Sequence, residues 1–132
     1  MAFTLYNYVL SGNCYKVRLM ASLLNVIYDA VAIDFHPGME HKSATMLDLN
    51  AAGTLPVLVT SDGAVLTETQ AMLLWLAQQF DQSNTWWPTE HPEQLTHILH
   101  WLGFANTLSA TVGELRLHSM INKAIDLSLI HI

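Results

Sequence analysis

The sequence contains few charged residues and a single cysteine. Lys and Arg total 5 against 11 Asp and Glu, and charged residues make up 12% of the 132, about half the fraction usual in soluble globular domains. Five scattered cations cannot form the basic stripe that neutralises a phosphate backbone, which excludes a nucleic-acid surface. Cys14 cannot form an internal disulfide, and this favours a reducing compartment, which we expect to be the cytoplasm.

Long apolar runs and a signal sequence are also lacking. No run approaches the ~20 apolar residues that span a bilayer, and the opening MAFTLYNYVL lacks the basic region and cleavage site of a signal peptide. We therefore expect no membrane partner. Apolar residues still make up 52% of the chain, which excludes disorder. So little charge predicts a surface short of polar cover, as if part of the protein or a partner were missing.

The first half of the chain alternates between strand and helix patterns. Residues 3–9 form an aromatic and β-branched run that predicts a strand, and residues 11–13 (Ser-Gly-Asn) end it in a loop. Apolar residues at helical spacing over 17–24 predict a helix after this loop. Residues 26–35 predict a second strand, and residues 41–50 predict a short, weakly patterned helix.

A hairpin and a third helix follow. The apolar runs 56–59 and 64–66 flank residues 61–63 (Ser-Asp-Gly), which is a strong hairpin signal. Thr67 and Gln70 have the spacing of a capping box, and an apolar helical stripe follows them. Alternation followed by a hairpin predicts an α/β fold, in which helices pack on the faces of a mixed sheet.

The remaining sequence has the pattern of a linker and one long helix. Residues 82–92, QSNTWWPTEHP, are polar and punctuated by proline, which is typical of a linker. Apolar residues from Leu95 onward recur at helical spacing and predict a helix that runs to about Met120. The last residues, LSLIHI, continue no clear pattern, and we interpret them as a cloning or assembly remnant rather than natural protein.

Ser11 lies where the first predicted strand gives way to the first helix. The N–H groups and positive dipole end of a helix N-terminus stabilise an anion such as a thiolate. A thiol of pKa ~8.5 needs only ~2.7 kcal/mol for a shift of two pH units, which a hydroxyl donor and the helix end can supply. Ser11 is therefore a candidate for activating a bound thiol. The alternative, which the residue types favour, is that Ser11 and Asn13 simply cap the helix.

Two further loops carry candidate ligand contacts. Pro56 can adopt the cis form at the start of a strand and leave the preceding backbone free to pair with a peptide-like ligand, although an ordinary edge-strand proline is the alternative. Thr69 can present its hydroxyl and N–H to a carboxylate, while Glu68 can accept from an ammonium group. This pair suits the amino-acid end of a zwitterionic ligand and is compatible with helix capping.

Other potentially reactive groups are better explained by packing or solvation. Cys14 lies near the start of the first helix, where a small buried side chain is favoured over a nucleophile. His97 and His100 have i, i+3 spacing but no third ligand close in sequence, so a zinc site is disfavoured. Lys16 and Arg18 are interpreted as solvated helix cations that ease the approach of an anion.

Three motifs occur in order on the expected elements: SGNCYKVRL at 11–19, GTLPVL at 53–58 and LTETQA at 66–71. Together they resemble the N-terminal domain of the cytosolic glutathione S-transferases. The resemblance covers residues 3 to about 81 and continues more weakly through WLGFANTLSATVGELRL. It implies a thioredoxin-like domain that binds glutathione, followed by the start of an all-helical second domain.

The resemblance implies domain limits as well. Residues 1–81 are the expected glutathione-binding domain, residues 82–92 the linker, and residues 93–132 the first helix of an incomplete, truncated all-α domain. That second domain normally spans several helices and supplies most of the pocket for the electrophilic substrate. The glutathione half of the site is therefore expected to be complete, and the electrophile half to be absent.

The resemblance also implies how the glutathione sulfur and cysteinyl group are bound. Ser11 matches the hydroxyl that hydrogen-bonds the sulfur in the serine-type classes, and the overall pattern is bacterial-like. Leu55, before a cis-Pro56, matches the backbone that pairs with the cysteinyl part of glutathione. Against a Cys-x-x-Cys redox pair, the first position is Ser11 and only Cys14 remains, which argues against disulfide exchange at this site.

The two ends of glutathione have implied ligands too. Glu68 and Thr69 match the acidic and hydroxyl pair that holds the γ-glutamyl group. His41, with Lys42 as a second candidate, lies where several classes reach the glycyl carboxylate.

The implied function is that of a glutathione transferase, with glutathione as co-substrate, no metal ion and a small electrophile as the second substrate. The family is usually homodimeric, so we expect a homodimer in the full-length form. A non-catalytic, transferase-like module that binds protein partners is the alternative. A thiol oxidoreductase that uses Cys14 is a third hypothesis.

Overall fold

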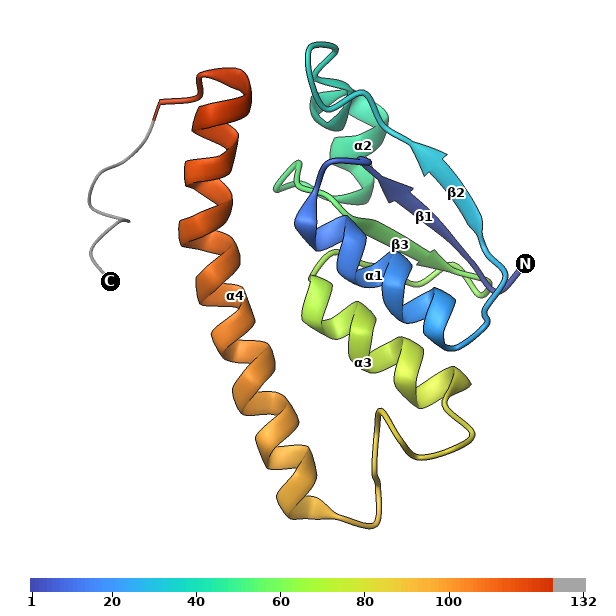
Figure 1. Ribbon diagram of the computed structural model, residues 1–132. Helices are drawn as coiled ribbons and strands as arrows, with labels where there is room; N and C mark the ends of the chain where they lie inside the picture. The colour runs from blue at the N-terminus through green and yellow to red at the C-terminus, as the bar shows by residue number, and fades with distance from the viewer. Residues whose placement is uncertain (125–132) are drawn as a thin grey trace. The chain divides into compact units, whose positions relative to one another are not determined.

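The computed structural model describes residues 1–124 of the chain (Figure 1). It divides into two compact units, Met1–Trp87 and a second unit that begins at Pro88. The division falls within residues 82–92, the segment expected to be a linker, and the domain limits drawn from the sequence stay a prediction. The terminal LSLIHI, interpreted above as a remnant, lies outside the described residues.

The first unit contains a four-stranded mixed sheet. Its strands are β1 (Phe3–Asn7), β2 (Asp29–Ala32), β3 (Val57–Thr60) and β4 (Val65–Leu66), in the order β2-β1-β3-β4. β1 pairs in parallel with β2 and antiparallel with β3, and β3 pairs antiparallel with β4. This arrangement confirms the expected α/β mixed sheet and the hairpin between the last two strands.

β2 is shorter than the sequence pattern indicated, because its four residues occupy only part of the predicted strand 26–35. Asn25 has a positive φ of 54°, and the Val26 N–H donates back to a carbonyl of the preceding helix, so the chain is still leaving that helix there. After β2, the Phe35 N–H donates to the Ile33 carbonyl at 2.9 Å. This turn ends the extended run.

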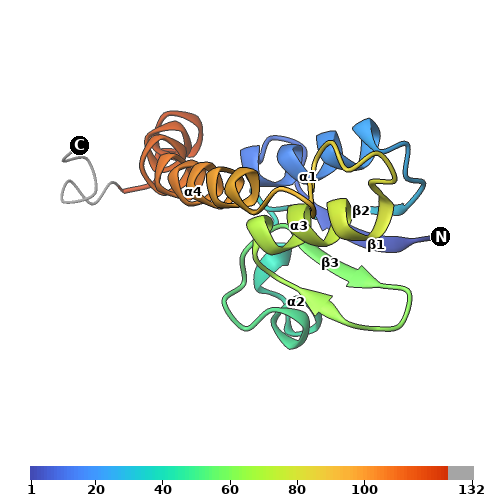
Figure 2. The same ribbon diagram turned by 90° about the horizontal axis from the view of Figure 1, so that it is seen from below.

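Helices cover both faces of the sheet. α1 (Gly12–Leu23) and α3 (Thr69–Phe80) lie on one face, and α2 (Ala44–Leu49) lies on the other (Figure 2). The 3₁₀ helix η1 (Glu40–Lys42) precedes α2, so the helix predicted over 41–50 is split in two.

The alternation of side chains along β1 explains why the core has two parts. Successive strand residues point to opposite faces, and Leu5 accordingly packs under α1 and α3 while Tyr6 packs beside Met46 of α2. The larger cluster draws its buried residues from both inner strands and both helices: Phe3, Leu5, Val17, Met20, Ala21, Leu58, Met72, Leu76 and Ala77. The result is the thioredoxin-like architecture expected from the sequence.

The start of α3 differs from the predicted capping box. The N-cap is Glu68, whose side chain makes no capping hydrogen bond, and Thr67 lies before the cap. The predicted pairing of Thr67 with Gln70 is therefore wrong. With the cap at Glu68, the third helical position falls on Ala71, whose side chain cannot hydrogen-bond back to the cap.

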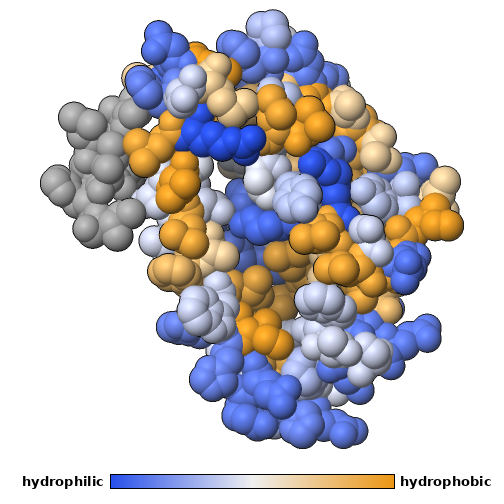
Figure 3. All heavy atoms as spheres, in the orientation of Figure 1, coloured by the Kyte–Doolittle hydropathy of each residue, from blue (hydrophilic) through white to orange (hydrophobic). Residues whose placement is uncertain are grey.

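Within the described residues, the second unit contains one helix, α4 (Pro92–Ile121), none of whose residues is buried. Leu99, Trp101, Phe104 and Leu108 are each at least 43% exposed, and apolar side chains gather along this helix in Figure 3. A helix with so much apolar surface is typical of one that neighbouring elements bury. Over residues 1–124, no helix combines the length and the apolar character needed to cross a membrane.

Candidate functional site

Segments from different parts of the chain meet at the carboxyl end of β1. The antiparallel ladder pairs Tyr6 with Val57, so the residues just before β3 lie beside this end. The parallel ladder pairs Asn7 with Ala32, so the chain that leaves β2 emerges at the same place. The β3–β4 hairpin then returns the chain, and α3 starts next to the start of α1 (Figure 1). The strand register therefore brings all the predicted site segments to the end of the sheet at which β1 terminates.

Ser11 caps α1 from the loop after β1. Its backbone is extended, with φ −77° and ψ 123°, and its Oγ accepts the Cys14 N–H at 3.2 Å. Its own N–H donates to the Tyr8 carbonyl at 3.1 Å. The predicted cap is confirmed, and because Oγ is the acceptor in this bond, the cap does not consume the hydroxyl hydrogen. Capping and thiol activation are therefore compatible roles for Ser11.

Cys14 is a buried thiol beneath the same loop. Its side chain is fully enclosed, and its Sγ accepts the Tyr8 N–H at 3.4 Å. Burial raises the pKa of the Cys14 thiol, against the opposing effects of the neighbouring Ser11 side chain, the Tyr8 N–H and the charge of Arg18. The thiol is thus neutral and out of reach of solvent. This confirms its interpretation as a small buried side chain and gives no support to the thiol oxidoreductase hypothesis.

The expected carboxylate ligand His41 is buried. Its ring stacks on Phe35 with 4.0 Å between centroids, and Phe35 stacks on Tyr8 at 5.3 Å. Only 4% of His41 is exposed, and its Nδ1 has no hydrogen-bond partner within residues 1–124. Burial lowers the pKa of His41, with a further contribution from the Lys42 charge. A neutral, enclosed imidazole is poorly suited to hold a carboxylate.

Lys42 is exposed and held in one place by the loop before β3. Its Nζ donates to the Ala52 carbonyl at 3.0 Å, and its side chain lies over Gly53. An ammonium group has three donors, so Lys42 keeps donors for an anionic ligand.

Leu55 is joined to Pro56 by a cis peptide bond, the form that the resemblance implied and one of the two alternatives left open by the residues alone. The β1–β3 ladder ends at Val57, so Leu55 lies beyond its last pair. The buried side chain of Asn50 holds the preceding loop, because its Nδ2 donates to the Thr54 carbonyl at 3.0 Å and to the Thr54 hydroxyl at 2.9 Å. Sequence reasoning missed Asn50, whose signal was only an Asx residue before a glycine-containing loop.

Glu68 and Thr69 stand at the start of α3, as expected. The Glu68 side chain is exposed and takes no part in capping, so its carboxylate remains available to a ligand cation. Thr69 is 5% exposed and contributes the first N–H of the helix, one of the groups without an intrahelical acceptor. A carboxylate acceptor and helix donors thus stand side by side.

Arg18 differs from its interpretation as a solvated cation. Its guanidinium donates to the Asn7 side-chain oxygen at 3.0 Å and to the Val9 carbonyl at 3.1 Å. The interpretation is therefore wrong, because these acceptors lie at the end of β1 and in the loop before α1, and they become neighbours of Arg18 only when the helix docks on the sheet.

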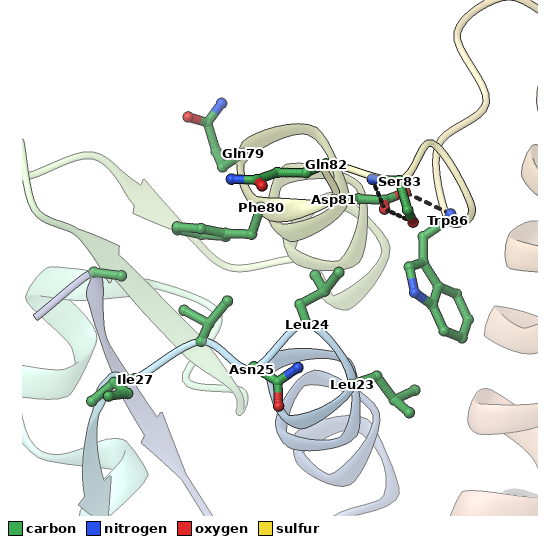
Figure 4. Close-up of a pocket in the computed structure, with 12 residues that line it drawn as sticks. Leu23, Leu24, Asn25, Ile27, Gln79, Phe80, Asp81, Gln82, Ser83 and Trp86 are labelled. Carbon is green, nitrogen blue, oxygen red and sulfur yellow. Dashed lines mark hydrogen bonds between the residues drawn. The ribbon is translucent and has the colours of Figure 1, made fainter.

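A groove of about 650 Å³ lies at the opposite end of the first unit, where α1 and α3 end (Figure 4). Leu24, Phe80 and Trp86 contribute apolar lining, and Asp81 is its ionisable residue. The Asp81 carboxylate accepts backbone N–H bonds from Ser83 at 3.1 Å and Trp86 at 2.6 Å. The groove thus lies at the C-terminal ends of α1 and α3, where the helix dipole does not stabilise a thiolate. Among the described residues, no group of three or more His, Cys, Asp or Glu is placed to hold a metal ion.

The fold and the site together define a thioredoxin-like domain in which a helix-capping serine, a cis-proline loop and a second helix start converge. The family model for the N-terminal domain of glutathione S-transferases matches residues 10–79, which is more than half of the chain. The chain belongs to the glutathione S-transferase family.

Individual relatives agree with this assignment. Glutathione S-transferase 2 of Schizosaccharomyces pombe is 36% identical over 81 residues, which cover 60% of this chain and 35% of that protein. Maleylacetoacetate isomerase of Pseudomonas aeruginosa is 29% identical over 79 residues, which cover 59% of this chain and 37% of that protein. A crystal structure of a possible glutathione S-transferase from Rhodopseudomonas palustris superposes with a TM-score of 0.78 and 30% identity, over 90% of this chain and 51% of that one. The chain thus spans just over a third of the curated relatives and about half of the solved structure.

Proposed function

We propose that this chain binds glutathione at the carboxyl end of β1 and that Ser11 activates the glutathione thiol. The observation that carries the proposal is the position of the Ser11 hydroxyl, at the N-terminus of α1 with its oxygen fixed by the Cys14 N–H at 3.2 Å. A hydrogen bond from this hydroxyl and the positive end of the helix both stabilise a thiolate. On this ground we assign the chain to the serine-type transferases.

The reaction we propose is the transfer of glutathione to an electrophilic carbon. The thiol releases its proton to solvent, and the thiolate sulfur forms a bond to the carbon. A leaving group such as a halide departs with the electron pair of the bond that breaks. The protein forms no covalent intermediate and contributes control of the thiol pKa and orientation of the nucleophile.

The backbone of Leu55 and the first residues of α3 hold the cysteinyl and γ-glutamyl parts of glutathione. Leu55 lies beyond the last ladder pair, which suits pairing of its backbone with the cysteinyl residue as an added strand. At the start of α3, Glu68 accepts from the γ-glutamyl ammonium group, and the N–H and hydroxyl of Thr69 donate to its carboxylate.

For the glycyl carboxylate, the geometry favours Lys42 over His41. The Lys42 ammonium is exposed and held at the Ala52 carbonyl, whereas the His41 ring is enclosed and stacked on Phe35. A charged, accessible donor is the better partner for a carboxylate, because the enclosed imidazole is neutral when buried.

The wider setting that we propose follows the family. The full-length protein is a cytoplasmic homodimer that uses glutathione as co-substrate without a metal ion. Its partners are glutathione and a small electrophile, with no role for nucleic acid or membranes. The electrophile binds against a helical domain of which this chain contains α4.

Calorimetric titration with glutathione, combined with the ultraviolet absorbance of the bound thiolate across pH, tests the proposal. We expect the wild-type chain to bind glutathione and Ser11→Ala to raise the pKa of the bound thiol by about two pH units. Ser43→Ala is the matched control, because Ser43 caps α2 by accepting the Met46 N–H at 3.4 Å. Both variants lose about 1 kcal/mol of capping. An unchanged thiol pKa in Ser11→Ala would remove Ser11 from the mechanism.

The apolar exposure of α4 supports a second candidate function, a non-catalytic module that binds a protein partner. Trp101 is 62% exposed, and no residue of this helix is buried. A folded wild-type chain that fails to bind glutathione in the same titration, with folding checked by circular dichroism, would favour this module over the transferase.

A further inference from the structure

The guanidinium of Arg18 donates hydrogen bonds to three consecutive residues, 7–9, in the segment that precedes Ser11. Its Nη1 donates to the Asn7 side-chain oxygen at 3.0 Å and to the Tyr8 carbonyl at 3.4 Å, and its Nη2 donates to the Val9 carbonyl at 3.1 Å. Because Arg18 belongs to α1, these bonds join the loop to the helix that Ser11 caps. Hydrogen bonds from a charged donor are the stronger kind, and the planar guanidinium fixes several acceptors at once.

The Tyr8 carbonyl links Arg18 directly to Ser11. This one oxygen accepts the guanidinium at 3.4 Å and also the Ser11 N–H at 3.1 Å. On the other side of the same residue, the Tyr8 N–H donates to the Cys14 sulfur at 3.4 Å. Tyr8 is thus held through both of its backbone polar groups, and a displacement of its carbonyl displaces the backbone of Ser11.

Asn7 extends this network into the sheet. Its Nδ2 donates to the Leu5 carbonyl at 3.3 Å and to the Val31 carbonyl at 3.2 Å, and the residue is 8% exposed. Loss of the guanidinium takes away the hydrogen-bond donor of the Asn7 side-chain oxygen, and a buried acceptor without a donor is costly. Arg18 therefore connects α1, the loop over 8–10 and the strands β1 and β2.

We propose that Arg18 is a positioning residue of the thiol site, whose guanidinium holds residues 8–10 in the conformation that places the Ser11 hydroxyl. The proposal rests on the function proposed for Ser11. It assigns Arg18 a different role from attraction of an anionic substrate, because the guanidinium bonds described above all go to acceptors of the protein itself.

The test compares wild type with Arg18→Met, Arg18→Lys and Arg116→Met, all in the full chain. Arg116→Met is the control, because it makes the same change on α4, in the other unit. Cys14 is the single cysteine, so its rate of reaction with an aromatic disulfide reagent in the absence of glutathione reports opening of the loop above it. The pH dependence of bound thiolate absorbance and the Kd for glutathione report the site, and thermal melting reports the fold.

In Arg18→Met, we expect Cys14 to react about tenfold faster than in wild type below the melting temperature, because the loop opens more often. The bound thiol should lose the activation that Ser11 provides, so its pKa rises, while the Kd for glutathione changes by less than about threefold. Arg18→Lys keeps the positive charge but loses the planar set of guanidinium donors. Its Cys14 reaction rate and the pKa of its bound thiol should therefore lie between those of wild type and Arg18→Met. Arg116→Met should match wild type in the Cys14 rate and in the thiol pKa.

Several outcomes overturn the proposal. An unchanged Cys14 rate in Arg18→Met means that the loop does not depend on Arg18. A faster rate with an unchanged thiol pKa means that the loop does not place Ser11. A large rise in Kd with an unchanged thiol pKa makes Arg18 a ligand contact instead, and an Arg18→Lys variant equal to wild type shows that charge alone matters.

Failure of the proposed function can be told apart from failure of this inference. If wild type does not bind glutathione, the proposed function fails, and amide hydrogen exchange at Ser11 replaces the thiol titration. Faster exchange at Ser11 together with faster labelling of Cys14 in Arg18→Met still supports the positioning role. Unchanged exchange at Ser11 overturns it.

Discussion

The side chain of Lys42 fills the space that a side chain on Gly53 would occupy. Gly53 has a φ of +58°, and a Cβ built there would collide with the Nζ and Cδ atoms of Lys42. This left-handed conformation is one that glycine adopts at little cost. Gly53 therefore permits both the turn before β3 and the placement of the ammonium group that we propose for the glycyl carboxylate.

Gly53→Ala should lower the free energy of unfolding by about 1–3 kcal/mol and weaken glutathione binding, because it strains the backbone and displaces Lys42. Gly63→Ala is the matched control, since Gly63 has a φ of +89° but no neighbouring atom within 4 Å. It should lose stability through strain and keep the wild-type Kd. Denaturant unfolding and calorimetric titration measure the two effects. Equal Kd values for both variants would contradict the role given to Lys42.

The Asp81 carboxylate organises the chain that leaves α3. It accepts the Ser83 hydroxyl at 2.6 Å and the Trp86 N–H at 2.6 Å. These bonds, with the Ser83 hydroxyl first, hold the pKa of Asp81 below its ordinary value. A carboxyl group with a lower pKa in the folded state stabilises the fold above its unfolded pKa, and this contribution disappears as the pH falls through the folded value.

Asp81→Ala should therefore lower the melting temperature at neutral pH, and the difference from wild type should shrink as the pH falls below about 4. Scanning calorimetry across this range measures the effect. Asp48→Ala, which removes an exposed carboxylate from α2, serves as the control and should leave the melting temperature close to wild type. A difference between Asp81→Ala and wild type that stays constant with pH would show that the carboxylate charge is not involved.

His41 should make the fold sensitive to mild acid. Burial lowers its pKa, so the unfolded chain binds a proton at a higher pH than the folded chain does. Stability is then complete above the unfolded pKa of about 6.5 and falls as the pH drops through this value toward the folded pKa. In His41→Phe, which keeps a ring beside Phe35, the free energy of unfolding should fall less between pH 7 and pH 5 than it does in wild type. In His97→Phe, which changes an exposed position of α4, the free energy of unfolding should fall as much as in wild type.

The exposed side chains of α4 should make the 132-residue chain associate as its concentration rises. Trp101 and Phe104 are 62% and 48% exposed and form an edge-to-face pair with 5.7 Å between centroids. Replacing both with Gln should shift sedimentation toward the monomer, whereas Tyr15→Gln, at a 55% exposed position on α1, should have less effect. A wild-type chain that is monomeric at all concentrations and unfolds cooperatively would count against this expectation.

Most of the fold could be predicted because its elements carry local signals. The hairpin of β3 and β4 follows from Ser-Asp-Gly between two apolar runs, and α1 follows from apolar residues at helical spacing. The limits of β2 and the cap of α3 could not be predicted in the same way. The turn after Ile33 and the choice of Glu68 over Thr67 as the cap depend on how the segments pack.

The residues of the candidate site can likewise be separated into those that local sequence signals predict and those that depend on packing. The Ser11 cap could be identified from sequence, because capping depends on immediate neighbours, whereas the cis form of Pro56 is indicated only by the resemblance to the family. Arg18 and Asn50 could not, because their acceptors lie in loops that come within reach only in the folded domain. The burial of His41 likewise depends on its stacking against Phe35.

The strand register at the carboxyl end of β1 has a thermodynamic consequence. The groups proposed to hold glutathione come from the starts of α1, β3 and α3 and from η1, so an unfolded chain presents no such site. Any glutathione bound then contributes its binding free energy directly to folding. At a glutathione concentration of 100 times Kd, the folded chain gains about 2.7 kcal/mol over the unfolded chain. In a glutathione-rich environment, the proposed ligand would act as a chemical chaperone for the domain that binds it.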